Sequence, residues 1–194
     1  FADTAIGLLE EVIAGNDDPK AQLSGASYSM GTTGLGYMIE CMKAGGYIDM
    51  EDADVMEMID EVVFKLATEA MLPRQQHDFL HGAMGVLHYI SQRLHVEEVA
   101  NYASQLTGAF CRNVVHEPEG SWFRNAVFSG DNPDEINFSL SHGNSGFLML
   151  LMNIYESGVE VAPVKEVVEK VMELLLHYRA EESGAESGQP LFPA

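Results

Sequence analysis

Three copies of one short pattern constrain the fold of this chain more than any other feature. Each copy is a pair of glycines spaced Gly-x-x-Gly, followed by a largely apolar run whose apolar columns stay in register between copies. The pairs are Gly31 with Gly34, Gly82 with Gly85, and Gly143 with Gly146. The copies lie about 50 to 60 residues apart, which is room for two helices and their connections. The pattern therefore predicts a repeating pair of helices.

The segments between the glycine-led runs have a different signature. Apolar residues recur at helical spacing over residues 55–70, 96–110 and 164–175, with acidic residues on the opposite face. A further helix is expected over residues 4–14, and strand signals are weak and confined to a hairpin or ordered loop near residues 122–128. Most methionines near the glycine motifs fall on apolar helix faces, where we expect them to fill gaps in the core. The alternation predicts an all-α protein with an inner helix layer covered on all sides and an outer layer covered on one.

Composition and charge exclude several classes of function. The chain has 194 residues, of which 46% are hydrophobic, so it can bury a sizeable core and is not intrinsically disordered. Its net charge of -20 repels phosphate backbones, which excludes a nucleic-acid partner. No apolar stretch approaches the roughly 18 residues of a membrane span. Cys41 and Cys111 are too far apart in sequence for a CxxC clip, and two cysteines make no disulfide framework, so we expect a cytoplasmic protein.

The glycines have a physical purpose at the start of each apolar helix. Glycine allows a close backbone approach and a tight entry turn, at a cost of about 0.5–1 kcal/mol relative to alanine. If the three helices point the same way, their first N–H groups gather at one mouth and favour an anion there. The residues placed at this mouth are Met30, His81 and His142 directly before the glycines, and Ser27, Asp78 and Ser139 four positions before them.

The second and third copies of the glycine motif, with the residues just before them, resemble a known family. The Ser-x-x-His-Gly-x-x-Gly phrase of residues 139–146 and the Asp-x-x-x-Gly phrase of residues 78–82 resemble the lanthionine synthetase cyclase family and its LanC-like relatives. The resemblance spans essentially the whole chain. It implies an α/α toroid, of which residues 1–194 form a single partial domain of about half a barrel, with helix-pair repeats starting near residues 27, 78 and 139.

The resemblance also implies an activity and its residues. The family's zinc-dependent cyclases add peptide cysteine thiols to dehydrated serine or threonine residues and so close thioether (lanthionine) rings. By its motif His142 matches the acid/base histidine, and Asp78 matches the aspartate that shares the site and orients or tunes an imidazole. His81 and Trp122 are candidates for contact with a peptide substrate, with Trp122 serving either as a substrate-contacting cover or as a hydrophobic plug. A leader segment on the peptide and a dehydratase partner are compatible with this reading.

The zinc ligands of the family do not occur in this sequence. The family places two cysteines and a histidine in a later Cys-x-Gly motif and a Cys-His-Gly motif, and neither follows Cys41 or Cys111. We therefore expect the front half of a longer cyclase, which by itself binds no zinc, is inactive and can associate with other copies through inner-helix flanks. The histidine cluster around residues 77–88 lacks the spacing of a metal motif.

Two alternatives remain open at this point. One is a metal-free α/α toroid that binds a peptide or a partner protein without catalysis. The other is a glycoside hydrolase, which needs two carboxylates about 5 to 10 Å apart across the mouth. Only Asp78 occupies a motif-flanking column, which weighs against the hydrolase.

Overall fold

The computed structural model describes residues 25–48, 53–127, 134–159 and 161–179, together with Asn132 and a few positions between residues 4 and 11. In chain order the elements are α2 (Thr32–Ala44), α3 (Ala53–Leu66), a π-helical turn (Ala67–Met71), a 3-10 turn (Leu72–Arg74), α4 (Ala83–Ser91), α5 (Glu97–Arg112), β1 (Val115–Glu117), β2 (Gly120–Trp122), α6 (Asn144–Glu156) and α7 (Val164–His177). Most of the helix expected over residues 4–14 lies outside the described residues.

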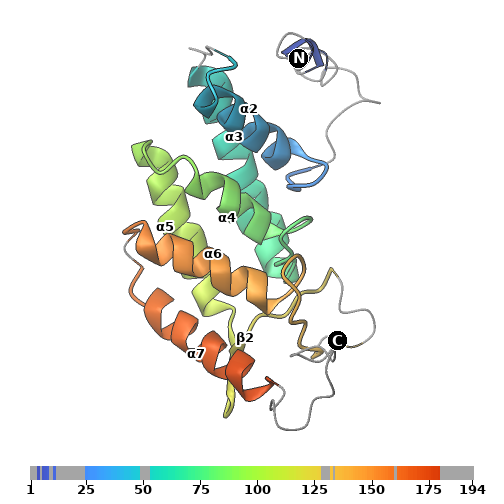
Figure 1. The fold of residues 1–194 in the computed structure, drawn as a ribbon, viewed down its shortest axis with the longest axis vertical. Coiled ribbons are helices and arrows are strands. Elements are labelled where there is room, and N and C mark those ends of the chain that lie inside the picture. The colour runs from blue at the N-terminus through green and yellow to red at the C-terminus, as the bar shows by residue number, and fades with distance from the viewer. Residues whose placement is uncertain are drawn as a thin grey trace, which may run out of the picture.

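The helices form three consecutive pairs arranged in a row (Figure 1). Within the pairs, α2 packs on α3, α4 on α5, and α6 on α7. Between the pairs, α4 contacts α2 and α6, while α5 contacts α3 and α7. The glycine-led helices α2, α4 and α6 thus form one layer, here called the inner layer, and the amphipathic helices form the other. The predicted all-α fold, in which glycine-led and amphipathic helices alternate along the chain and form two layers, is confirmed.

The inner helices begin at the same side of the row, as expected from the repeated motif (Figure 1). In each motif a Cβ on either glycine would collide with the backbone carbonyl oxygen six residues earlier. These carbonyls belong to Gly25, Gln76 and Asn137 for the first glycines and to Tyr28, Phe79 and Leu140 for the second. The preceding loop therefore lies directly on the first turn of the helix, and only glycine leaves room for it.

The same loops bind the first helical amide, which corrects one prediction. The N–H groups of Thr32, Ala83 and Asn144 donate to the carbonyls of Gly25, Gln76 and Asn137 at 3.0, 2.9 and 2.8 Å. The expectation that the gathered helix starts offer free N–H groups to an anion is wrong for this amide in all three motifs. The loop carbonyl already satisfies it.

A buried ionic network joins the first two helix pairs. Arg93, which follows α4, donates to both carboxylate oxygens of Asp60 on α3 at 2.8 to 3.1 Å and also binds Glu40 on α2. The hydroxyl of Tyr89 donates to the same Asp60 at 2.6 Å. Because each buried charge has several partners, the network holds α2, α3 and α4 in one arrangement.

The short hairpin lies earlier in the chain than predicted. Its antiparallel strands pair Val115 with Trp122, and β2 packs on α7. Gly120 has φ +147°, and a Cβ there would meet the backbone of Lys170 and Leu174 on α7. The observed hairpin thus ends at Trp122, where the predicted one begins. Gly120 lets β2 approach α7 closely.

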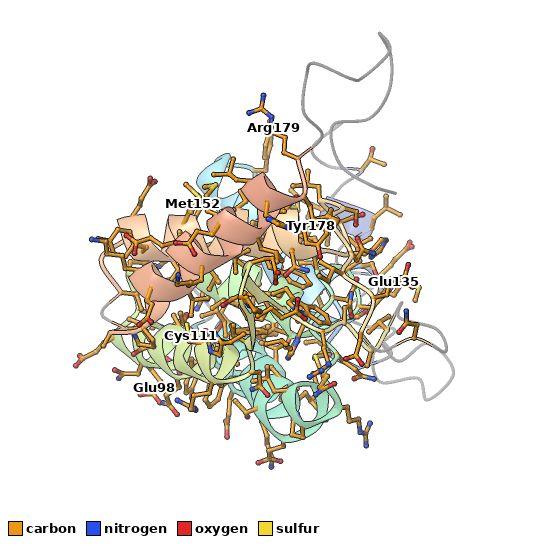
Figure 2. The ribbon with its side chains drawn as sticks, turned by 90° about the horizontal axis from the view of Figure 1, so that it is seen from below. Glu98, Cys111, Glu135, Met152, Tyr178 and Arg179 are labelled. Atoms are coloured by element: carbon orange, nitrogen blue, oxygen red, sulfur yellow. The ribbon has the colours of Figure 1, made fainter. Side chains whose placement is uncertain are left out.

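The expected role of the methionines is only partly correct. Met84 on the central inner helix is buried, whereas Met38 on α2 and Met149 and Met152 on α6 are exposed. Figure 2 shows the position of Met152. Helices α2 and α6 stand at the ends of the described row, so each has a single inner neighbour and keeps part of its apolar face uncovered. No helix in the described part of the chain is long and apolar enough to cross a membrane.

Candidate functional site

The turn before each inner helix is held by the residue four positions ahead of the first glycine. Ser27 and Ser139 accept, through Oγ, the backbone N–H of the third residue on, at 3.2 Å in both turns. Asp78 does the same in the second turn, where Oδ1 accepts the N–H of Leu80 at 2.9 Å and of His81 at 2.7 Å. A serine with one oxygen suffices for this turn. The carboxylate therefore keeps its second oxygen for another purpose.

That second oxygen of Asp78 contacts His142 from the next repeat. Nδ1 of His142 lies 2.7 Å from Oδ2 of Asp78, and because an ionised carboxylate only accepts, Nδ1–H is the donor. The carboxylate is fully buried, whereas the His142 side chain is 27% exposed. With Nδ1 engaged, Nε2 is the nitrogen through which the ring can exchange a proton with a bound molecule. The predicted meeting of an imidazole and a carboxyl from separate repeats is therefore found.

Asn125 completes the surroundings of the buried carboxylate. Its Nδ2 donates to Oδ2 of Asp78 at 3.2 Å and to the backbone carbonyl of His142 at 2.8 Å. Asp78 thus receives two backbone donors on Oδ1 and two side-chain donors on Oδ2. These bonds offset the cost of removing the charge from water.

His81 lies beside His142, as its position in the repeat predicts. The two rings are nearly parallel, at 7°, with centroids 6.5 Å apart. Nδ1 of His81 is 3.0 Å from Oγ of Ser29, and the N–H of Ser29 donates to the carbonyl of Leu80. The turns of all three repeats therefore meet at one end of the inner layer. Contact of His81 with a substrate stays a prediction.

Reasoning from the sequence missed Asn125. It belongs to no repeat column and stands in the segment between the hairpin and the third motif, where the chain shows no periodic pattern. The only signal was its place in an aromatic stretch, Trp122-Phe123-Arg124-Asn125, close to the third glycine motif.

His77, the neighbour of Asp78, is buried in a different environment. Its ring packs against Phe110 and Phe123, and its Nδ1–H donates to the carbonyl of Arg124 at 2.6 Å. Within the described part of the chain, no hydrogen-bond partner reaches its buried Nε2. Burial lowers the pKa of His77 from 6.5 to about 4, so the ring is neutral at pH 7.

Acid should therefore destabilise the protein between about pH 6.5 and pH 4. In this range the unfolded chain binds a proton at His77 that the folded chain does not, so the free energy of unfolding falls as the pH falls. The expected loss across the range is at most about 3 kcal/mol. Urea unfolding at pH 7 and pH 5 measures it. His77→Gln cannot titrate and should show a flatter pH dependence, and equal slopes for both proteins would contradict the assignment.

Trp122 is placed inside the protein and not over the site. The residue is 1% exposed, and its Nε1–H donates to Glu117 across the hairpin at 3.1 Å. Of the two roles considered for it, this burial agrees with a hydrophobic plug and offers no surface to a substrate.

The two cysteines are far from a ligand arrangement. Cys41 is exposed on α2, while Cys111 is buried in the last turn of α5. Burial raises the pKa of the Cys111 thiol to about 11, which disfavours the thiolate that binds metals. Among the described residues no three His, Cys, Asp or Glu side chains group as a metal site. These residues therefore do not fit zinc.

Comparison with models of protein families identifies a relationship over almost the whole chain. A family model described as lanthionine synthetase C-like protein matches residues 4–187, nearly the whole chain. Comparison with curated proteins gives no match. The matched range contains all three glycine motifs and every residue of the cluster around Asp78.

Proposed function

The chain belongs to the lanthionine synthetase C-like family, and on this premise we propose that His142 and Asp78 transfer the proton in a thioether-forming peptide cyclase. The observation that carries the proposal is the 2.7 Å contact between the partly exposed imidazole and the fully buried carboxylate. A buried anion bonded to Nδ1 holds the ring in one orientation and stabilises it when it carries a second proton. Such a pair is suited to general acid/base catalysis.

The proposed reaction is the addition of a cysteine S–H across the Cα=Cβ bond of a dehydroamino acid. The sulfur forms a bond to Cβ, the π electrons move to Cα and the adjacent carbonyl, and an enolate results. Nε2 of His142 accepts the proton as the S–H bond breaks and then donates a proton to Cα, so the imidazole ends in the state in which it began. Atoms and charge balance, because the product is an isomer of the substrate.

Any zinc ion used by this protein would be held by residues outside the described set. The family's metal holds the cysteine sulfur as a thiolate at neutral pH. The described residues do not fit a zinc site. The steps assigned to this chain are therefore limited to holding and moving the proton and to orienting the imidazole.

His142→Ala in the intact protein should abolish ring closure while leaving the helix content unchanged. General acid/base groups contribute about 100- to 10,000-fold to a rate, so the remaining rate should fall by that factor. The substrate is a synthetic peptide with one cysteine and one dehydroalanine. Because cyclisation leaves the mass unchanged, product is counted by loss of thiols that can be alkylated before mass spectrometry.

His95→Ala is the matched control, because His95 is exposed and lies in the turn before α5. Its rate should equal that of the unmodified protein. Cyclisation at an unchanged rate in His142→Ala would remove His142 from the mechanism. Peptide binding without turnover by the unmodified protein would favour the metal-free binding module instead.

A further inference from the structure

The side-chain amide of Asn125 joins the two members of the proposed catalytic pair. Its NH2 group has two protons, and each has one acceptor: Oδ2 of Asp78 at 3.2 Å and the carbonyl of His142 at 2.8 Å. Its own Oδ1 accepts the N–H of Val127 at 3.2 Å, which fixes which end of the amide faces the pair. Asn125 is 7% exposed, so it contacts these groups from inside the protein.

The backbone around Asn125 is anchored on both sides. The N–H of Phe123 donates to Oδ1 of Asn144 at 2.8 Å, the carbonyl of Arg124 accepts from His77 at 2.6 Å, and the N–H of Ala126 donates to the carbonyl of Gln75 at 2.9 Å. Two of these anchors come from the turn that contains Asp78, and one comes from the first residue of α6, two positions after His142. The segment is therefore attached to both halves of the pair.

Among these anchors, the buried His77 is the one whose tautomer and charge are defined by its surroundings. A carbonyl can only accept, so Nδ1 of His77 carries the proton, and burial keeps the ring neutral at pH 7. Its neighbour in sequence is Asp78. The ring thus links the turn of the carboxylate to the residue next to Asn125 without adding a charge near the pair.

We propose that Asn125 is a positioning residue for the Asp78–His142 pair and that His77 holds the Asn125 segment in place. The inference rests on the proposed function. Asn125 sets the direction of Oδ2 through one N–H and the backbone of His142 through the other, and so fixes the angle at which the ring meets the carboxylate. Because it is buried, it acts on the ring and not on the substrate.

Asn125→Asp tests this role with almost no change in size. The variant loses both N–H donors and places a carboxylate beside Asp78, so the Nδ1–H of His142 should lose its fixed geometry. In protein labelled with 15N-histidine, the downfield Nδ1–H resonance of His142, identified by its absence in His142→Gln, should shift or broaden. The kcat for cyclisation should fall about 10- to 100-fold with KM unchanged, since small misplacements of a reacting group have effects of this size.

Asn113→Asp is the control, because it makes the same chemical change at an exposed asparagine whose Nδ2 donates to the carbonyl of Ala109 in the preceding helix. It should change neither the resonance nor kcat. An unchanged His142 resonance in folded Asn125→Asp would overturn the proposal. The resonance tests the positioning role even if the unmodified protein forms no thioether. Absence of thioether formation would contradict the proposed cyclase activity but not the positioning role of Asn125.

A second variant, Asn125→Ser, tests the proposal if Asn125→Asp does not fold. Asn125→Ser has one hydroxyl proton and can serve only one of the two acceptors, so a smaller change in the same resonance is expected. If both variants fail to fold, Asn125 is a structural residue of the core and the proposal is wrong.

Discussion

Asp78→Ser is expected to leave the protein folded and to lower its rate of thioether formation about 100- to 10,000-fold. The first and third repeats already use serine at this position, and Ser27 and Ser139 accept the same backbone N–H that Oδ1 of Asp78 accepts. Serine should therefore keep the turn. It cannot replace Oδ2, so Nδ1 of His142 loses the acceptor that orients the ring.

The comparison with Asp78→Ala separates the two roles of the carboxylate. Alanine removes the turn cap as well as the partner of His142. It should therefore lower the free energy of unfolding by about 1 kcal/mol, as loss of a cap does, and should lower the rate of thioether formation as Asp78→Ser does. Thermal unfolding and the thiol-alkylation assay measure both effects. An Asp78→Ser protein that cyclises at the normal rate would show that the turn cap is the only role of Asp78.

Gly146→Ala should destabilise the protein by more than about 3 kcal/mol, at the upper end of the range for overpacking. A Cβ at Gly146 would fall on the carbonyl oxygen of Leu140, and the neighbouring atoms are backbone and cannot rotate away. The loop between these residues carries His142. The variant should therefore lose cyclase activity together with stability, as measured by urea unfolding and the alkylation assay.

Gly108→Ala is the matched control on an outer helix. Among the described residues, a Cβ at Gly108 would meet the end of the Arg112 side chain at 3.4 Å and Val161 at 3.9 Å, and no backbone atom from outside its own helix within 4 Å. Replacing glycine by alanine inside a helix then stabilises by up to about 0.5 to 1 kcal/mol. Equal effects of the two substitutions would mean that the close loop approach is not what requires glycine.

Much of the architecture could be predicted from the sequence because it repeats. The apolar columns after each Gly-x-x-Gly specify helices that must be covered, and the amphipathic segments between them specify helices that cover them. The same columns place His142 and Asp78 at equivalent ends of neighbouring helices, so their meeting at 2.7 Å follows from parallel inner helices. The exposed methionines on α2 and α6 depart from this pattern because these helices end the described row.

The connections between repeats were less predictable. Asn125 and Trp122 stand in a segment without periodicity. The residues around Asn125 are held by hydrogen bonds to His77, Gln75 and Asn144, which are far away in sequence. Trp122 is held by the pairing of β2 with β1 and by its bond to Glu117. The carbonyls that accept the first helical N–H groups belong to Gly25, Gln76 and Asn137, which stand outside the glycine motifs. The sequence therefore carries no sign that this N–H group of each helix is already bonded.

The amino-acid sequence alone determined the all-α pairing, the role of the glycines and the pair of His142 and Asp78, because these depend on local periodicity and on columns that repeat. Only the tertiary structure decided which side chains surround the buried carboxylate, that Trp122 is internal, and that His77 is neutral and linked to Arg124. The physical reason is that burial and long-range hydrogen bonds depend on how the aperiodic segments pack, and no local pattern encodes that packing.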